Sequence, residues 1–225
     1  MPQSLDPGTV QPGQAAPDFA LPLVSSDGQV SMADYRGRAP LFLALLRSFE
    51  CPFCRRSLAA LKSVGEAMAR SGIETLVVTT TAKREARLYT RYRPAGLPLA
   101  SDPKLTIHRA FGVPIIQYTT EGPTRWPEQV NVADLKQTEI NPSEDWGTGL
   151  TVLEARMALA EEDGFEKIDT DEDGPPDDAS PLVTFFLIDR DGTVSWAFTE
   201  ALDNLADYGI HPGREVFLEA AKLVL

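Results

Sequence analysis

A pair of cysteines that follows an apolar segment constrains this chain more than any other feature. Leu41–Leu46 is apolar at every position, which is typical of a strand buried on both faces of a sheet. Cys51 and Cys54 come shortly afterwards in the motif Cys-Pro-Phe-Cys, and they are the two cysteines of the chain. Pro52 suits the first position of a helix, where its missing N–H group costs nothing. The sequence therefore predicts a buried strand that leads into a helix, with Cys51 at the helix start.

This position predicts a reactive thiol at Cys51. Free backbone N–H groups and the positive end of the helix dipole favour a thiolate over a thiol. The charged neighbours in the sequence are Arg47, Glu50, Arg55 and Arg56. Cys54 lies one helical turn further on, within reach of the Cys51 sulfur. We therefore expect a redox dithiol in which Cys51 is the nucleophile and Cys54 resolves the intermediate by forming a disulfide with it.

Two other roles for the cysteines remain open. The pair can consist of inert thiols in the core. It can also be half of a zinc site, but such a site needs four ligands, and the remaining candidate donors are His108 and His211 without a second Cys-x-x-Cys motif. A disulfide across so short a loop constrains little chain entropy, which excludes a structural staple. We expect the site to use neither a metal nor a cofactor.

Composition excludes several classes of protein. The chain has 225 residues, with 33 acidic against 21 basic residues and a formal net charge of −12. A nucleic-acid-binding protein needs cationic surface, so this class is excluded. Apolar runs fall far short of the roughly 18 residues of a membrane span, and residues 1–14 show no signal peptide. We expect a soluble cytoplasmic protein that does not bind membranes.

The acidic residues are concentrated in one segment. Residues 115–180 hold 17 acidic and 4 basic residues, whereas the rest of the chain is almost neutral. We interpret this segment as an acidic insertion in a single domain that spans residues 16–225, after a flexible arm at residues 1–15. Within the insertion, the capping box Thr151-x-x-Glu154 predicts a helix over Val152–Glu162. Leu153, Met157 and Ala160 are expected to form its packed face.

Strand and helix patterns alternate on either side of the insertion, which predicts an α/β fold. Before the insertion we expect a hairpin of residues 19–21 and 29–31, then a helix after Cys51 whose buried face is Leu58, Leu61, Val64 and Met68. A strand at residues 75–79 and a helix at residues 83–93 follow. The next helix is expected to have Asp102 as its N-cap and Pro103 as its first residue. After the insertion we expect a hairpin of residues 182–188 and 193–198 and a last helix with Val216, Phe217, Ala220 and Val224 inward.

Several motifs in this order resemble the alkyl hydroperoxide reductase/thiol-specific antioxidant family, the peroxiredoxin-like redoxins. They are Ala16-Pro17-Asp18-Phe19, Asp27-Gly28, residues 35–40, the Cys51–Arg55 motif, Ser101-Asp102-Pro103, residues 110–113 and residues 186–192. The resemblance covers roughly residues 16–114 and 182–225. It implies a thioredoxin-like three-layer α/β/α sandwich, a disulfide or hydroperoxide as substrate, and a thiol reductant such as a thioredoxin-like protein as partner.

The chain departs from the family pattern at positions that bear on function. Peroxiredoxins carry Pro-x-x-x-Thr-x-x-Cys, whereas here Ala44 replaces the proline and the Ser48 hydroxyl group stands in for that of threonine. They also carry an arginine near the position of Val183, where this sequence has none. Thioredoxin-type reductases place a cis-proline there, for which Pro181 is the candidate. Thiol–disulfide oxidoreduction is therefore the first expectation, and peroxidase activity through a Cys51 sulfenic acid is the alternative.

The insertion offers a hypothesis from a different class, a calcium-binding module. Residues 169–174 fit the first half of a calcium loop, in which alternating carboxylates bind one cation and Gly174 permits the turn. Ser180, however, stands where such a loop needs a bidentate glutamate. Pro175 and Pro176 also disfavour the helix that leaves a calcium loop. The other interpretation is a solvated acidic linker.

We also expect that the insertion can overhang the cysteines and restrict the access of substrates to Cys51. In the implied fold it emerges at the junction that leads to the loop facing Cys51, with Trp126 and Trp146 available as apolar contacts. The alternative is that each tryptophan only packs the insertion into place. The negative charge of the insertion is expected to repel anionic substrates from any cleft that it covers.

Overall fold

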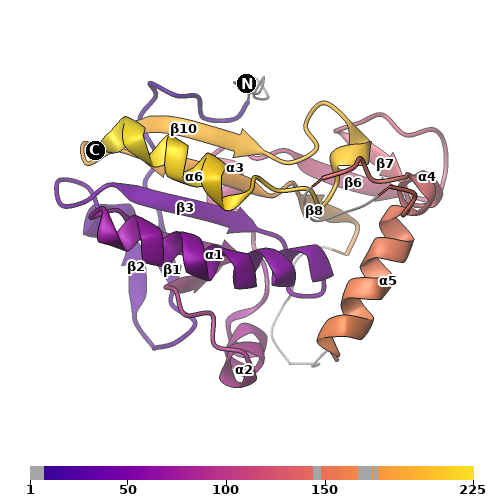
Figure 1. Cartoon of the computed structure of the whole chain (residues 1–225), viewed down its shortest axis with the longest axis horizontal. Coiled ribbons are helices and arrows are strands. Elements are labelled where there is room, and N and C mark those ends of the chain that lie inside the picture. The colour runs from indigo at the N-terminus through magenta and orange to yellow at the C-terminus, as the bar shows by residue number, and fades with distance from the viewer. Residues whose placement is uncertain (1–7, 144–147, 167–173, 175–176) are drawn as a thin grey trace.

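A five-stranded sheet lies at the centre of the computed structural model, which describes residues 8–143, 148–166, 174 and 177–225 (Figure 1). Its strands are β3 (Leu41–Leu46), β4 (Glu74–Thr79), β5 (Leu99–Ser101), β9 (Thr184–Ile188) and β10 (Val194–Thr199). Their order is β10-β9-β3-β4-β5, with β3, β4 and β5 parallel and β9 antiparallel to both neighbours. The predicted strands and the hairpin after the insertion are confirmed, and the strand before the cysteines is the central one.

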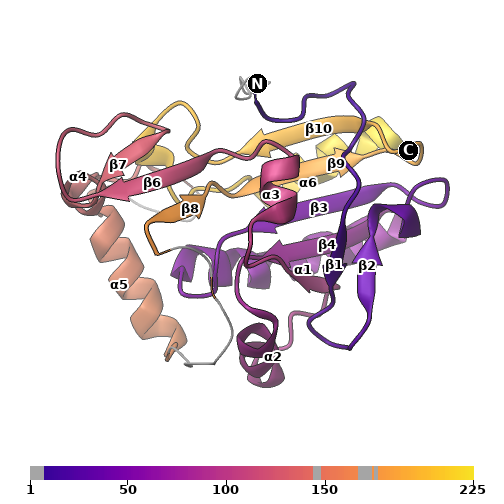
Figure 2. The same ribbon diagram turned by 180° about the vertical axis from the view of Figure 1, so that it is seen from behind.

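Helices and a hairpin cover the two faces of this sheet. The helices are α1 (Pro52–Arg70), α2 (Lys83–Tyr92), α3 (Thr106–Ala110) and α6 (Arg214–Ala221), with short 3-10 helices at Met32–Asp34, Leu205–Asp207 and Lys222–Val224. The hairpin consists of β1 (Ala20–Pro22) and β2 (Gln29–Ser31). Helices α1 and α6 lie side by side on one face, and α3 lies on the other face with the hairpin (Figures 1 and 2). The result is a three-layer arrangement.

The side chains of β3 explain why its sequence is apolar without alternation. Phe42, Ala44 and Leu46 belong to the core beneath α1 and α6. Their neighbours Leu41, Leu43 and Leu45 belong to a second core beneath α3 and the hairpin. Successive strand residues point to opposite faces, so a strand covered on both sides must be apolar throughout.

The acidic segment forms a folded subregion with its own sheet. Its elements are β6 (Ile115–Thr119), β7 (Gln129–Asn131), α4 (Val132–Gln137), α5 (Val152–Asp163) and β8 (Ala179–Pro181). The strands pair in the order β7-β6-β8. Ile116, Val130, Ile140 and Leu159 are buried in the same core as Cys51. The acidic segment therefore shares a hydrophobic core with α1. No helix in the described part of the chain is both long enough and apolar enough to span a membrane.

The predicted helix in the insertion is present, but its packed face is different. Its capping box is formed as predicted, because Thr151 and Glu154 each accept from the other's backbone N–H group. The buried residues are Val152, Ala155 and Leu159, whereas Met157 is 62% exposed. The packed face is rotated by about one residue, or 100°. Apolar residues surround this helix, so packing against α1 selects the buried face.

Two smaller expectations at the other helices are wrong. Helix α3 begins at Thr106 rather than at Pro103, because the Asp102 carboxylate accepts from the Thr106 N–H group at 2.7 Å and the intervening Leu105 takes a left-handed conformation with φ of 57°. In α6, Val216 is 47% exposed, while Phe217 and Ala220 are buried as predicted. The exposed Val216 lies on the solvent side of the helix.

Candidate active site

Cys51 stands at the junction between the central strand and α1, as predicted. It is the N-cap residue of α1, in an extended conformation, and Pro52 is in the first turn. Its carbonyl oxygen accepts from the N–H groups of Cys54 at 3.1 Å and Arg55 at 3.2 Å. Both cysteines are free thiols in the structure, and both are buried, with Cys51 8% exposed. The motif thus has the local geometry that the sequence predicted.

The two thiols have opposite pKa shifts. Burial opposes ionisation of Cys51, but hydrogen bonds from Cys54 and the positive charge of Arg47 outweigh it and hold the pKa of Cys51 well below its usual value. Burial raises the pKa of Cys54 well above its usual value, and the hydrogen bond to Cys51 and its negative charge add to this. The opposite shifts therefore favour the thiolate on Cys51 and the proton on Cys54.

Arg47 supplies the positive charge next to this thiolate. It directly follows β3, its side chain is 3% exposed, and the hydroxyl group of Thr79 donates to its carbonyl oxygen at 2.9 Å. Its guanidinium group lies 4.3 Å from the centre of the Tyr208 ring and forms a two-pronged ion pair with Glu200. Among the described residues, its buried Nε atom has no hydrogen-bond partner. A guanidinium group is thus present beside Cys51, although the family arginine near Val183 is absent.

Glu200 organises this side of the site. It is fully buried directly after β10, and its carboxylate accepts from the N–H groups of Val183 at 2.9 Å and Gly209 at 3.1 Å. Its Oε2 atom also lies 2.8 Å from Nε2 of His211, whose Nδ1 atom contacts the Ser57 hydroxyl group. The carboxylate therefore joins Arg47 and the β8–β9 connection to the segment before α6.

Glu200 and Tyr208 were not predicted from the sequence, and His211 was predicted only as a possible zinc donor. Each comes from the chain after the insertion, far from the cysteines in sequence. A single glutamate after a strand is an ordinary surface pattern, so no local signal distinguishes Glu200. His108, the other candidate zinc donor, pairs with Asp102 at 2.9 Å. No group of three or more metal-ligating side chains occurs within the described residues.

Aromatic side chains enclose the cysteines and connect them to the insertion. The ring of Tyr208 packs edge-on against Phe53 of the cysteine motif and against Trp126 of the insertion. Trp126 also donates to the carbonyl oxygen of Ala201 at 2.6 Å. The hydroxyl groups of Tyr118 and Tyr208 are 3.4 Å apart. Trp126 thus packs against Tyr208, whereas Trp146 lies outside the described residues.

The other sequence-predicted site residues have different environments. The main-chain carbonyl oxygen of Ser48 accepts a hydrogen bond from the Cys51 N–H group at 3.0 Å. Pro181 pairs with Ile115 as the last residue of β8, and its peptide bond is trans; the cis peptide bond among the described residues precedes Pro127. The expected cis-proline at Pro181 is therefore wrong. The calcium-loop residues 169–173 lie outside the described residues.

Comparisons with known proteins agree with this architecture. The sequence profile of the AhpC/TSA family matches residues 12–128. The peroxidoxin BcpB of Mycobacterium tuberculosis superposes with a TM-score of 0.57 at 14% identity, over 96% of this chain and 99% of that one. The 2-Cys peroxiredoxin of Plasmodium vivax gives 0.55 at 16% identity, over 92% and 79%. A candidate protein disulfide isomerase from Bacteroides thetaiotaomicron gives 0.52 at 14%, over 96% and 91%.

At such identities the solved structures establish the fold alone. They are peroxiredoxins and thioredoxin-like redoxins, so the predicted thioredoxin-like α/β fold is confirmed. No curated protein sequence matches the chain.

Proposed function

Because the chain belongs to the AhpC/TSA family, we propose that it is a thiol–disulfide oxidoreductase with Cys51 and Cys54 as its redox pair. The observation that carries this proposal is that the two thiols differ in acidity: the pKa of Cys51 is lowered and that of Cys54 is raised. A thiolate attacks a disulfide, whereas a protonated thiol is a poor nucleophile and reacts only after it has lost its proton. The arrangement thus suits a nucleophile and a resolving thiol.

The proposed reaction has two exchange steps. The Cys51 thiolate attacks one sulfur of the substrate disulfide, forms a mixed disulfide and releases the first substrate thiolate. Cys54 then loses its proton and attacks the Cys51 sulfur, which forms the Cys51–Cys54 disulfide and releases the second substrate thiol. The substrate gains two electrons and the enzyme loses two. A thiol reductant, such as a thioredoxin-like protein, restores the dithiol.

A hydroperoxide is the second candidate substrate, and Arg47 is the observation that favours it. Its buried Nε–H group has no hydrogen-bond partner within the described part of the chain, although the guanidinium group lies beside Cys51. Such a donor stabilises the charge that develops as the O–O bond breaks. The Cys51 thiolate attacks the terminal oxygen of the hydroperoxide, the O–O bond breaks, and Cys51 becomes a sulfenic acid. The alkoxide that leaves takes a proton from water and becomes an alcohol. Cys54 then attacks the sulfenic sulfur, which forms the same disulfide and releases water.

Mass spectrometry tests the shared part of both reactions. Stoichiometric oxidised glutathione or hydrogen peroxide is expected to give a Cys51–Cys54 disulfide in the wild type. With Cys54→Ser, Cys51 is expected to stop as a mixed disulfide or a sulfenic acid. Cys51→Ser is the control and should yield neither product. An oxidised site centred on Cys54, or none, would contradict the proposal.

Steady-state rates separate the two substrates. With dithiothreitol as reductant, the wild type is expected to reduce a model disulfide such as insulin and to lose this activity with Cys51→Ser. The same preparations are then assayed for peroxide consumption. Peroxide turnover above about 10⁵ M⁻¹s⁻¹ without disulfide reduction would make peroxidase activity the principal function.

A further inference from the structure

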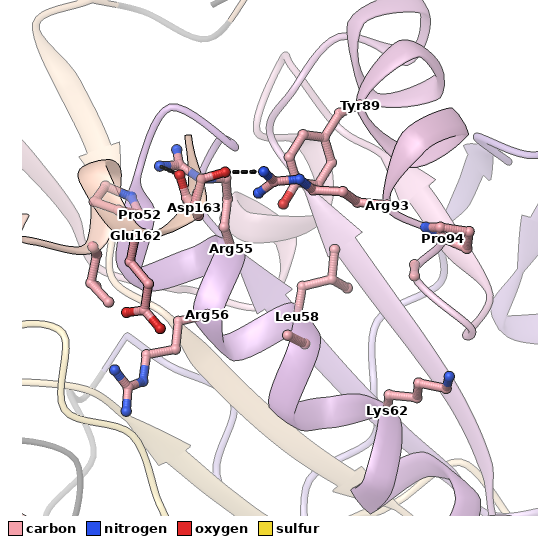
Figure 3. A pocket seen from close by; sticks show the side chains of 13 residues that line it. Pro52, Arg55, Arg56, Leu58, Lys62, Tyr89, Arg93, Pro94, Glu162 and Asp163 are labelled. Atoms are coloured by element: carbon pink, nitrogen blue, oxygen red, sulfur yellow. Dashed lines mark hydrogen bonds and ion pairs between the residues drawn. The ribbon is translucent and has the colours of Figure 1, made fainter. Parts of the chain in front are cut away.

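A cavity beside the cysteine motif has the chemistry of a binding site for an organic anion. Its volume is about 510 Å³, within the usual range of small-molecule sites. It lies between α1, the end of α2 and the end of α5, and Figure 3 shows its lining residues. The insertion contributes Leu159, Glu162 and Asp163 to one wall. The cavity therefore exists because α5 packs beside α1.

The cavity runs along α1 and away from the nucleophile. Pro52, the residue after Cys51, is at one end, and Lys62 is at the other (Figure 3). Ten residues of helix separate them, a rise of about 15 Å. Between them the surface is largely non-polar, with Leu58 and Ala59 from α1, Leu159 from α5 and the ring of Tyr89 from α2. This shape suits an elongated molecule with a non-polar body.

The charge of the cavity is positive, although the chain as a whole is acidic. Four basic side chains line it, Arg55, Arg56, Lys62 and Arg93, against the two carboxylates of Glu162 and Asp163. Arg55 binds both carboxylate oxygens of Asp163, at 2.5 and 3.2 Å, which neutralises that pair. Arg93 donates to the backbone carbonyl oxygen of Asp163, a neutral acceptor. The local field therefore has the sign opposite to that expected from the net charge of the insertion.

We propose that this cavity holds the substrate of the dithiol, and that the substrate is an elongated organic anion with a non-polar body. Its anionic end lies at Lys62 and its reactive disulfide or peroxide lies at the Pro52 end, where the lining residue directly follows Cys51 in the chain. This assignment rests on the proposed function for the reaction, but the binding itself does not depend on it. If the acidic insertion repels anionic substrates, Cys51 should react more slowly with them. If the basic cavity binds them, Cys51 should react with them faster.

Binding of decanoate, a non-reactive probe, tests the site without any turnover. Calorimetry on the reduced full-length protein is expected to show one decanoate per chain and weaker binding of decanol. Lys62→Glu should weaken decanoate binding about fivefold, and Lys104→Glu, an exposed lysine on another face, should leave it unchanged. Ala59→Phe, which fills the cavity, should abolish binding, while the adjacent exposed Ala60→Phe should not. Absent binding, or binding that is insensitive to Lys62→Glu and Ala59→Phe, overturns the site.

Reaction rates then test the substrate class. The probes are a dialkyl disulfide with terminal carboxylates and its dimethyl ester, and the readout is the rate of Cys51 oxidation. The carboxylate form should react faster than the ester, and Lys62→Glu should remove this preference, whereas Lys104→Glu should keep it. If Cys51 reacts equally fast with the carboxylate and the ester, the proposed substrate class is wrong, but the proposed oxidoreductase function stands. If decanoate binds but Cys51 does not react, the binding site survives and the proposed function fails.

Discussion

Glu200 holds Arg47 against the cysteine motif from the far end of β10. The carboxylate and the guanidinium group form a fully buried ion pair, and the Tyr208 ring covers the guanidinium group. Burial of a charge in this way is costly unless the partner and the hydrogen bonds are complete. Besides its ion pair with Arg47, the Glu200 carboxylate accepts hydrogen bonds from the backbone N–H groups of Val183 and Gly209, which compensate for the burial of its charge. The positive charge of Arg47 thus stays beside Cys51.

Replacement of Arg47 is expected to raise the pKa of Cys51. The positive charge of Arg47 and its hydrogen bond favour the thiolate, so Arg47→Met removes two stabilising contributions while burial still opposes ionisation. Below the thiol pKa, each unit of increase lowers the alkylation rate about tenfold. Iodoacetamide alkylation of Cys51 at pH 7, followed by peptide mapping, measures the effect. Arg70→Met at the other end of α1 is the control, and an unchanged rate with Arg47→Met would contradict the role of Arg47.

Arg47→Met is also expected to destabilise the fold. It removes the arginine partner of the buried Glu200 carboxylate, and breaking a buried ion pair in this way typically costs about 3–5 kcal/mol. The double variant Arg47→Met/Glu200→Gln removes both charges and should recover part of this loss. Urea denaturation of the reduced proteins gives the two free energies of unfolding. A double variant no more stable than Arg47→Met would show that the cost arises from packing rather than from the unpaired charge.

The lowered pKa of Cys51 predicts a specific pH dependence of stability. A thiol with a lowered folded-state pKa stabilises the protein fully above its unfolded pKa of about 8.5, and this contribution is lost as the pH falls through the folded-state pKa. Below about pH 8 Cys54 stays protonated, because its pKa is raised. The difference in unfolding free energy between the reduced wild type and Cys51→Ser should therefore grow with pH up to about 8. A constant difference would show that the pKa of Cys51 is not lowered.

Local patterns were enough to predict the strand, the helix and the cysteines at their junction. The apolar run, the proline after Cys51 and the spacing of Cys54 all act over a few residues. The partners of Cys51 were not predictable in this way. Arg47 was recognised only as a nearby charge, and its anchor Glu200 lies about 150 residues away in sequence. Only the pairing of β9 with both β3 and β10 brings the two together.

The packed face of α5 shows a different limit. Val152, Leu153, Met157 and Leu159 are spread around the helix, so more than one apolar face is consistent with its sequence. Contact with α1 and the ion pair between Arg55 and Asp163 decide which face is buried. Leu153 and Met157 consequently face away from the core. The capping box, a local signal, was predicted at the right residues.

Gly209 is expected to be intolerant of any side chain. It has a φ of 82°, and a Cβ atom there would lie 2.6 Å from Cδ1 of Phe53 in the cysteine motif. Gly209→Ala should therefore lower the melting temperature and slow the reaction of Cys51, since Phe53 must move. Gly122→Ala is the matched control, with a φ of 75° and no atom of the described residues within 4 Å of the added Cβ. It carries only the backbone cost of about 1 kcal/mol. Equal effects of the two variants would show that the contact with Phe53 is unimportant.

Asp163 is expected to fasten the insertion to the cysteine helix. Its carboxylate binds the buried Arg55 of α1, whose guanidinium group also lies 4.0 Å from the centre of the Phe165 ring. Asp163→Asn keeps the shape but removes the charge, which is expected to cost about 1–3 kcal/mol. Hydrogen exchange should accelerate in α5 but not in the central strands. Glu161→Gln, an exposed carboxylate on the same helix, makes the same charge change as a control. If both variants leave exchange in α5 unchanged, apolar packing alone holds the insertion against α1.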